Sequence, residues 1–127
     1  MKSNMLKLTA LSLGLACAVQ ASANWTDVKD AAELRALHTN TTLVGRAGDT
    51  FYAHYYDGGA ASTIVKGAPM PGAWDLNGNS EVCVKGLAGA ECYRFQKTGE
   101  FETQYRAIRV RDGMAIPVRV EKSVPEF

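Results

Sequence analysis

An excess of either charge is missing from this chain: 14 Lys and Arg residues face 13 Asp and Glu residues, which gives a net charge of +1. Without a basic excess there is no broad attraction to nucleic acid or to an anionic membrane surface, so we expect neither partner. The apolar runs are also too short for a membrane span, which needs about 20 residues. The 127 residues leave room for one domain, because a compact domain usually takes about 100 to 200.

Sequence motifs of known chemistries are lacking as well. The chain contains no G-x-S-x-G, no P-loop, no G-x-G-x-x-G and no H-E-x-x-H, and its acidic residues form no recognisable catalytic pair. Histidine is scarce, and neither His38 nor His54 lies at finger-like spacing from a cysteine pair. The sequence therefore predicts no metal site, no cofactor and no catalytic set.

What is present begins with an export signal. Lys2 and Lys7 precede a short apolar run, and the run ends in an A-x-A site at Ala23. This is the plan of a cleaved secretory signal peptide over residues 1–23, with residues 24–127 as a single β-rich domain in the periplasm or outside the cell. Lipidation at Cys17 is the alternative, and the residues before this cysteine fit it poorly. Removing 23 of the 127 residues leaves 104, with a charge near −1.

Two cysteines remain after cleavage, Cys83 and Cys92. In an exported domain of this size such a pair most often forms a disulfide, and two free thiols are the alternative. Direct pairing across a hairpin would place Val82 and Tyr93 on one apolar face. The disulfide and an ion pair of Glu81 with Arg94 would then lie on the other face.

One helix and then a series of strands follow from the residue pattern. Thr26 is a suitable N-cap, and apolar residues recur at helical spacing, which predicts a helix over residues 27–38. His38 is then an ordinary residue at the C-terminal end of this helix. Residues 67–72, with two prolines, are expected to interrupt regular structure. Strands are expected over residues 40–45, 50–56, 62–66, 81–85, 92–96, 100–110 and 115–121, with another that starts at Trp74.

The register of the last hairpin can be predicted from side-chain parity. Ile108 should share the apolar face with Ile116 and Val118. A three-residue loop over residues 111–113 places these side chains on one face, and it requires Gly113 to adopt the left-handed backbone conformation. The same register places Arg109 on the opposite face.

A candidate binding surface lies on the aromatic strand. Tyr52, His54 and Tyr56 share one face of this strand, which we expect to be exposed, and they alternate with residues predicted to face the core, Phe51, Ala53 and Tyr55. Such side chains contact ligands by stacking and hydrogen bonding, although solvated strand faces often carry them too. We therefore predict Tyr52, His54 and Tyr56 as the ligand-binding residues.

Three short motifs follow one another along the chain: an aromatic strand that ends in Asp57-Gly58, a G-x-W strand at residues 72–74, and paired cysteines in adjoining strands. Over about residues 31–98 this order resembles a family of small exported bacterial proteins, a domain of unknown function. The resemblance implies a disulfide-stapled β domain in the bacterial envelope, and it brings no established activity or catalytic residues. The insert at residues 67–72 departs from the family pattern.

The pattern of helix, strands and cysteines predicts a mainly β fold. An N-terminal helix is followed by a small antiparallel β-meander, as a bent sheet or barrel of about six to eight strands, with one disulfide. The leading functional hypothesis is a non-enzymatic periplasmic binding or interaction module for a small molecule or an envelope protein. One alternative is an inhibitor of an extracytoplasmic enzyme that acts through residues 67–72 or 86–90. The other is a small hydrolase or metal-dependent enzyme that uses His54 with a carboxylate such as Asp57.

Overall fold

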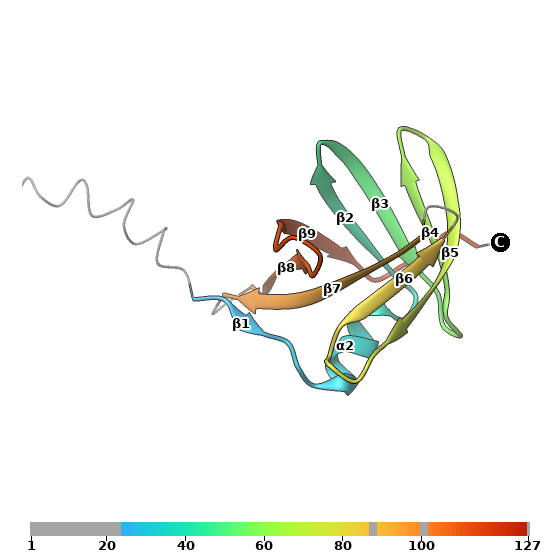
Figure 1. Ribbon diagram of the computed structural model, residues 1–127. Helices are drawn as coiled ribbons and strands as arrows, with labels where there is room; N and C mark the ends of the chain where they lie inside the picture. Colours follow the sequence, from blue (N-terminus) through green and yellow to red (C-terminus); the bar gives the residue numbers. More distant parts are fainter. Residues whose placement is uncertain (1–23, 87–88, 100–101, 127) are drawn as a thin grey trace, which may run out of the picture.

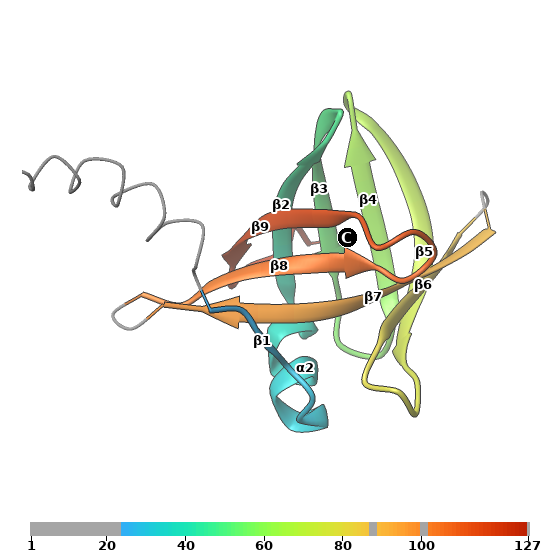
Figure 2. The ribbon, with the colours of Figure 1, turned by 60° about the vertical axis from the view of Figure 1, so that its left-hand side comes forward.

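The computed structural model describes residues 24–86, 89–99 and 102–126. The predicted signal peptide lies outside these residues. Strands β2 to β9 form a closed antiparallel barrel in which each strand pairs with the next along the chain (Figures 1 and 2). Pairing of β2 with β9 closes the barrel. The predicted fold class, mainly β with one helix and an antiparallel meander, is confirmed.

The barrel follows a short strand and a helix. Strand β1 (Thr26–Asp27) pairs with the far end of β7, and helix α2 (Ala31–His38) follows it. The barrel strands are β2 (Thr41–Ala47), β3 (Asp49–Tyr55), β4 (Ala60–Val65), β5 (Ala68–Leu76), β6 (Val82–Gly86), β7 (Gly89–Thr98), β8 (Gln104–Arg109) and β9 (Ala115–Glu121).

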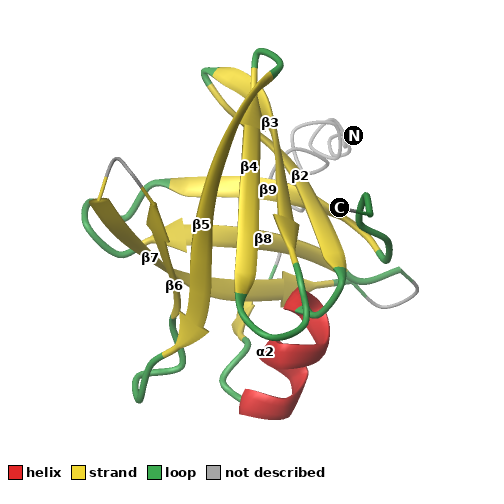
Figure 3. Cartoon of the chain, turned by 90° about the vertical axis from the view of Figure 1, so that its right-hand side faces the viewer, coloured by secondary structure: helices red, strands yellow, loops and turns green. Residues whose placement is uncertain are grey.

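The two ends of the barrel differ. The hairpins that join β2 to β3, β4 to β5, β6 to β7 and β8 to β9 all lie at one end, because the strands run alternately up and down. Helix α2 lies at the opposite end, below the barrel in Figure 3. Its Leu34 and Leu37 are buried in the same core cluster as Tyr55 of β3 and Phe95 of β7. The helix therefore closes one end of the barrel, and the four hairpins surround the other.

The helix is shorter than predicted. It begins at Ala31, after Asp30, whose side chain accepts a hydrogen bond from the backbone N–H of Ala32. The predicted N-cap, Thr26, instead pairs with Lys97 in the sheet. An aspartate is as good an N-cap as a threonine, so local sequence did not distinguish the two starts.

The expected interruption at residues 67–72 is wrong, because β5 runs through most of it. Pro69 and Pro71 pair with β4, but β6 extends only as far as the Gly72 to Gly86 pair. Within the described residues, both prolines therefore lie where β5 has a paired strand on one side only. A missing backbone N–H is tolerated at such an edge position.

The predicted register of the last hairpin is also wrong. Ala107 pairs with Ile116, so Ala107 faces the core and Ile108 is buried outside the core cluster. The loop is one residue longer than expected, closed by a hydrogen bond from Arg109 N to Met114 O at 2.9 Å. Gly113 does have a positive φ, of 76°. Alternation of apolar residues predicted the wrong register because β8 carries apolar residues on both of its faces.

The predicted disulfide is confirmed: the Cys83 and Cys92 sulfurs are 2.08 Å apart, and the two residues are direct partners in β6 and β7. The predicted ion pair between Glu81 and Arg94 is wrong. Arg94 pairs instead with Asp27, which β1 brings alongside β7.

Candidate functional site: a cavity inside the barrel

Small residues at inward-facing positions leave a cavity of about 350 Å³ inside the barrel. An eight-stranded barrel has an interior that full-sized side chains just fill, so alanine and glycine at these positions create free volume. Its lining includes Ala53, Ala61, Gly72 and Ala107. The volume is at the lower end of the range for small-molecule pockets, which starts at about 300 Å³.

The walls of the cavity are mainly apolar and extend from the hairpin end to the middle of the core. Near the hairpins the lining includes Ala47, Val65 and Gly89, which are terminal residues of their strands. Deeper positions are occupied by Leu43, Tyr55, Phe95 and Ile116, all at most 5% exposed. The cavity is therefore a cup with its mouth among the hairpins.

An aromatic cluster lies between the cup and helix α2. The His38 ring contacts Tyr55 and Phe95 edge-on, with centroid distances of 4.7 and 4.6 Å, and Trp74 lies 5.8 Å away. His38 is fully buried, and burial lowers its pKa to about 4. Its Nδ1 is 2.8 Å from the carbonyl of Leu34, and only a protonated nitrogen can donate to that carbonyl. At neutral pH the ring is therefore uncharged, with its proton on Nδ1.

The Tyr55 hydroxyl belongs to a buried side chain on the cavity wall. Tyr55 is 5% exposed, and among the described residues its hydroxyl has no hydrogen-bond partner. Burial raises its pKa, so the phenol keeps its proton. It is a hydrogen-bond donor that faces an apolar cup.

Three charged residues that line the cavity near its mouth, Asp49, Glu91 and Arg109, are in ion pairs. Arg109 lines the cavity and forms a two-point contact with Asp112, with distances of 3.0 and 2.7 Å. This pairing lowers the pKa of Asp112 to about 2. Glu91 pairs with Arg111 at 3.2 Å. Burial of Tyr93, which also lines the cup, raises its pKa.

The predicted ligand-binding residues lie on the outside of the barrel. Tyr52 is 44% exposed there. The expectation that His54 is exposed is wrong, since it is 8% exposed and its Nδ1 is 2.7 Å from the Thr42 hydroxyl. The Tyr56 hydroxyl donates to the carbonyl of Pro125 at 3.0 Å. The C-terminal segment therefore contacts this face, and a ligand-binding role for it stays a prediction.

The other candidate sites are not assembled in the described residues. The one side-chain partner of His54 is Thr42, and Asp57 interacts through its backbone N–H with Asn40. Residues 67–72 form part of a strand rather than a free loop, and the second predicted inhibitory loop includes residues 87–88, which lie outside the described residues.

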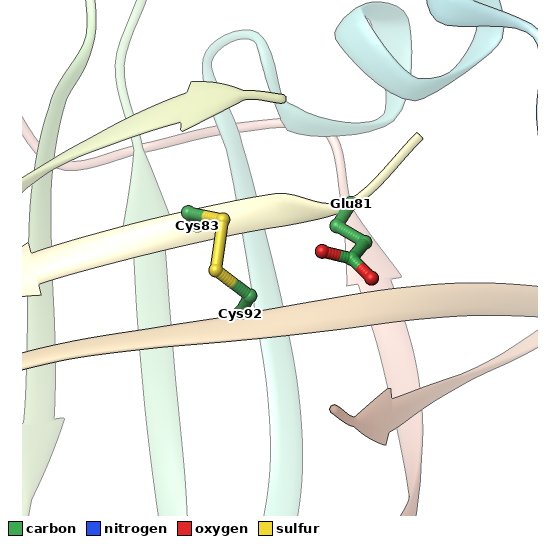
Figure 4. A group of neighbouring side chains, drawn as sticks. All are labelled: Glu81, Cys83 and Cys92. Carbon is green, nitrogen blue, oxygen red and sulfur yellow. A yellow bond between two sulfur atoms is a disulfide. The ribbon is translucent and has the colours of Figure 1, made fainter. Parts of the chain in front are cut away.

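The carboxylate of Glu81 and the sulfurs of Cys83 and Cys92 lie within 4.8 Å of one another. Figure 4 shows these three side chains, with a bond between the two sulfurs. Both sulfurs are bonded to each other, so neither is a thiolate that binds a metal. The Glu81 carboxylate accepts a hydrogen bond from Asn77 at 2.7 Å. This group is a disulfide with a neighbouring carboxylate.

Sequence reasoning missed the cup. Tyr55 and Ala53 were recognised as core residues, but the small residues opposite them on β4 and β8 were not read as free space. The available signal was a set of inward positions too small to fill a barrel: Ala53, Ala61 and Ala107.

No family model, curated protein or solved structure matches this chain. The resemblance to small exported bacterial proteins therefore stays a prediction. Within the described residues, no helix has the length and apolar character needed to cross a membrane.

Proposed function

We propose that this protein is a non-enzymatic binding module that holds one small, largely apolar molecule inside its barrel. The observation that carries the proposal is the cup of about 350 Å³ with mainly apolar walls. Each 100 Å² of apolar ligand surface removed from water contributes about 2.5 kcal/mol to binding. A ligand that fills the cup also restores the dispersion contacts that its empty walls lack.

Most charged residues at the mouth already have a partner, which favours an apolar ligand over an ionic one. Arg109 and Glu91 are held by Asp112 and Arg111, so an ionic ligand would have to displace an existing partner. Met70, which lines the cavity on β5, is 47% exposed and offers a flexible apolar side chain at the entrance.

Residues 1–23 support a place for this module in the bacterial envelope, after cleavage near Ala23. The Cys83–Cys92 disulfide supports the same proposal, because such bonds persist in oxidising compartments. The mass of the protein recovered from an envelope fraction tests it, and a chain that begins at Asn24 is expected. A chain that keeps residues 1–23 in the cytoplasm would contradict it.

Two variants of neighbouring residues test the binding site. Thr63 lines the cup, and Ile64, the next residue of β4, faces the outside because side chains alternate along a strand. Thr63→Phe places a phenyl ring in the cup, and Ile64→Phe places the same ring on the outer face. The probe is the fluorescent apolar amine N-phenylnaphthylamine, titrated into each protein.

We expect the native protein and Ile64→Phe to bind this probe with similar affinity and Thr63→Phe to bind it at least tenfold more weakly. Circular dichroism and urea unfolding of both variants establish that they are folded. Equal binding by the two variants would refute the cup as the site, and so would no binding by the native protein.

A further inference from the structure

The Tyr55 hydroxyl is distinctive because it is buried, unpartnered and yet accessible. Among the described residues, His38 Nε2 is the one fully enclosed side-chain nitrogen or oxygen that lacks a partner. The Tyr55 hydroxyl also lacks a partner among the described residues but is not fully enclosed, and its side chain lines the cup. Buried polar groups are normally hydrogen-bonded, which marks this hydroxyl as a position for an acceptor.

The surroundings of Tyr55 decide what kind of acceptor fits. In the lining Leu43, Phe95 and Ile116 are apolar and Tyr93 adds a neutral phenol, and His38, whose ring contacts Tyr55, is uncharged at neutral pH. The charged side chains of the lining, such as Asp49 and Arg109, belong to strand ends at the mouth. A carboxylate beside Tyr55 would lose its hydration without gaining a countercharge, whereas a neutral carbonyl oxygen would lose far less.

We propose that the ligand is a neutral apolar molecule with a carbonyl oxygen at its leading end, and that this oxygen accepts a hydrogen bond from Tyr55. The apolar remainder of the molecule then extends along the walls toward the hairpins. This inference rests on the proposed function, since it names the chemical class that the cup takes.

Two model ligands isolate the carbonyl. Methyl octyl ketone carries the acceptor next to a terminal methyl group, and its methylidene analogue has CH₂ in place of the oxygen. Each ligand competes with N-phenylnaphthylamine for the native protein, Tyr55→Phe and Tyr52→Phe. The last variant is the matched control, because it removes the same hydroxyl from the outer face of the same strand. Each ligand is compared across proteins, so differences in water solubility cancel.

One net hydrogen bond corresponds to a loss of about three- to tenfold in affinity. We expect that loss for the ketone with Tyr55→Phe, no change for the methylidene analogue, and no change for either ligand with Tyr52→Phe. Unchanged ketone affinity would overturn the inference, as would equal weakening of both ligands. Failure of the native protein to bind N-phenylnaphthylamine would refute the proposed function itself.

A measurement on the native protein keeps the inference testable if Tyr55→Phe does not fold. Nuclear Overhauser contacts are recorded between bound methyl octyl ketone and the Tyr55 ring. We expect contacts from the methyl group beside the carbonyl. Contacts from the methyl group at the far end of the octyl chain would show the opposite orientation and overturn the inference.

Discussion

His54 donates a hydrogen bond from Nδ1 to the Thr42 hydroxyl at 2.7 Å. The direction follows because the single Thr42 hydroxyl proton is donated to the carbonyl of Ser123, also at 2.7 Å. Residues 54, 42 and 123 thus form a chain of two hydrogen bonds that ties the segment after β9 to the outside of β2 and β3. Within the described part of the chain, His54 thus helps to hold the C-terminal segment against the outer face of the barrel.

The first prediction concerns this chain. Thr42→Val removes the hydroxyl that satisfies both a buried imidazole N–H and the Ser123 carbonyl, so we expect the free energy of unfolding to fall by about 1 to 3 kcal/mol. Thr42→Ser keeps the hydroxyl and should recover most of the loss. Urea unfolding measures both, and equal destabilisation by Val and Ser would contradict the hydrogen-bond explanation.

The second prediction concerns pH and His38. Burial lowers the pKa of this histidine to about 4, from about 6.5 in the unfolded chain. As pH falls from 6.5 to 4 the unfolded chain takes up a proton that the folded protein resists, so stability declines across this window, by up to about 3 kcal/mol. Burial also lowers the pKa of His54, which acts in the same direction.

Urea unfolding at pH 7.5 and at pH 4.5, for the native protein and for His38→Leu, measures the contribution of His38. The native protein should lose more stability between the two pH values than the variant. A loss of the same size in both proteins would mean that His38 is not the titrating group.

The third prediction concerns the disulfide. It closes a short loop, with a sequence separation of nine, between two strands that already pair. The chain-entropy model gives about 2 to 3 kcal/mol for a loop of this length. We expect Cys83→Ser combined with Cys92→Ser to lose this amount in urea unfolding and to bind N-phenylnaphthylamine as the native protein does. Loss of binding in a folded double variant would give the disulfide a role in shaping the cup.

The fourth prediction concerns the close approach of β5 to β6. A Cβ atom on Gly72 would collide with the backbone oxygen of Lys85, so Gly72→Ala forces two paired strands apart. We expect it to destabilise the protein by about 1 to 3 kcal/mol, the usual cost of overpacking. Gly78→Ala is the control, because a Cβ there meets nothing within 4 Å. The two variants are compared by their midpoints of urea unfolding. Similar midpoints would contradict the explanation by close contact between β5 and β6.

Most strand positions other than the start of β5 were predictable because they depend on local alternation and turn residues. The disulfide was predictable because a small exported domain carries two cysteines. Tyr55 and Ala53 were correctly placed on the core face of their strand by alternation alone. The start of the helix was not predictable, because Thr26 and Asp30 are both good caps and only pairing with β7 decides between them.

The cup was harder to predict because it depends on residues that meet across the barrel. Ala61 and Ala107 are far apart in sequence, and only closure of the barrel brings both to one cavity. Burial of His54 has the same origin, since its partner Thr42 lies on the neighbouring strand and Ser123 lies near the end of the chain.

The central claim, that a ligand lies inside the barrel, is tested most directly by methyl NMR of the native protein during titration with N-phenylnaphthylamine. The account predicts that shifts concentrate on inward methyl groups, such as those of Leu43, Val84 and Ile116, while the outward methyl groups of Ile64 stay unchanged. Shifts confined to the outer face around Tyr52, His54 and Tyr56, or no shifts at all, would contradict it.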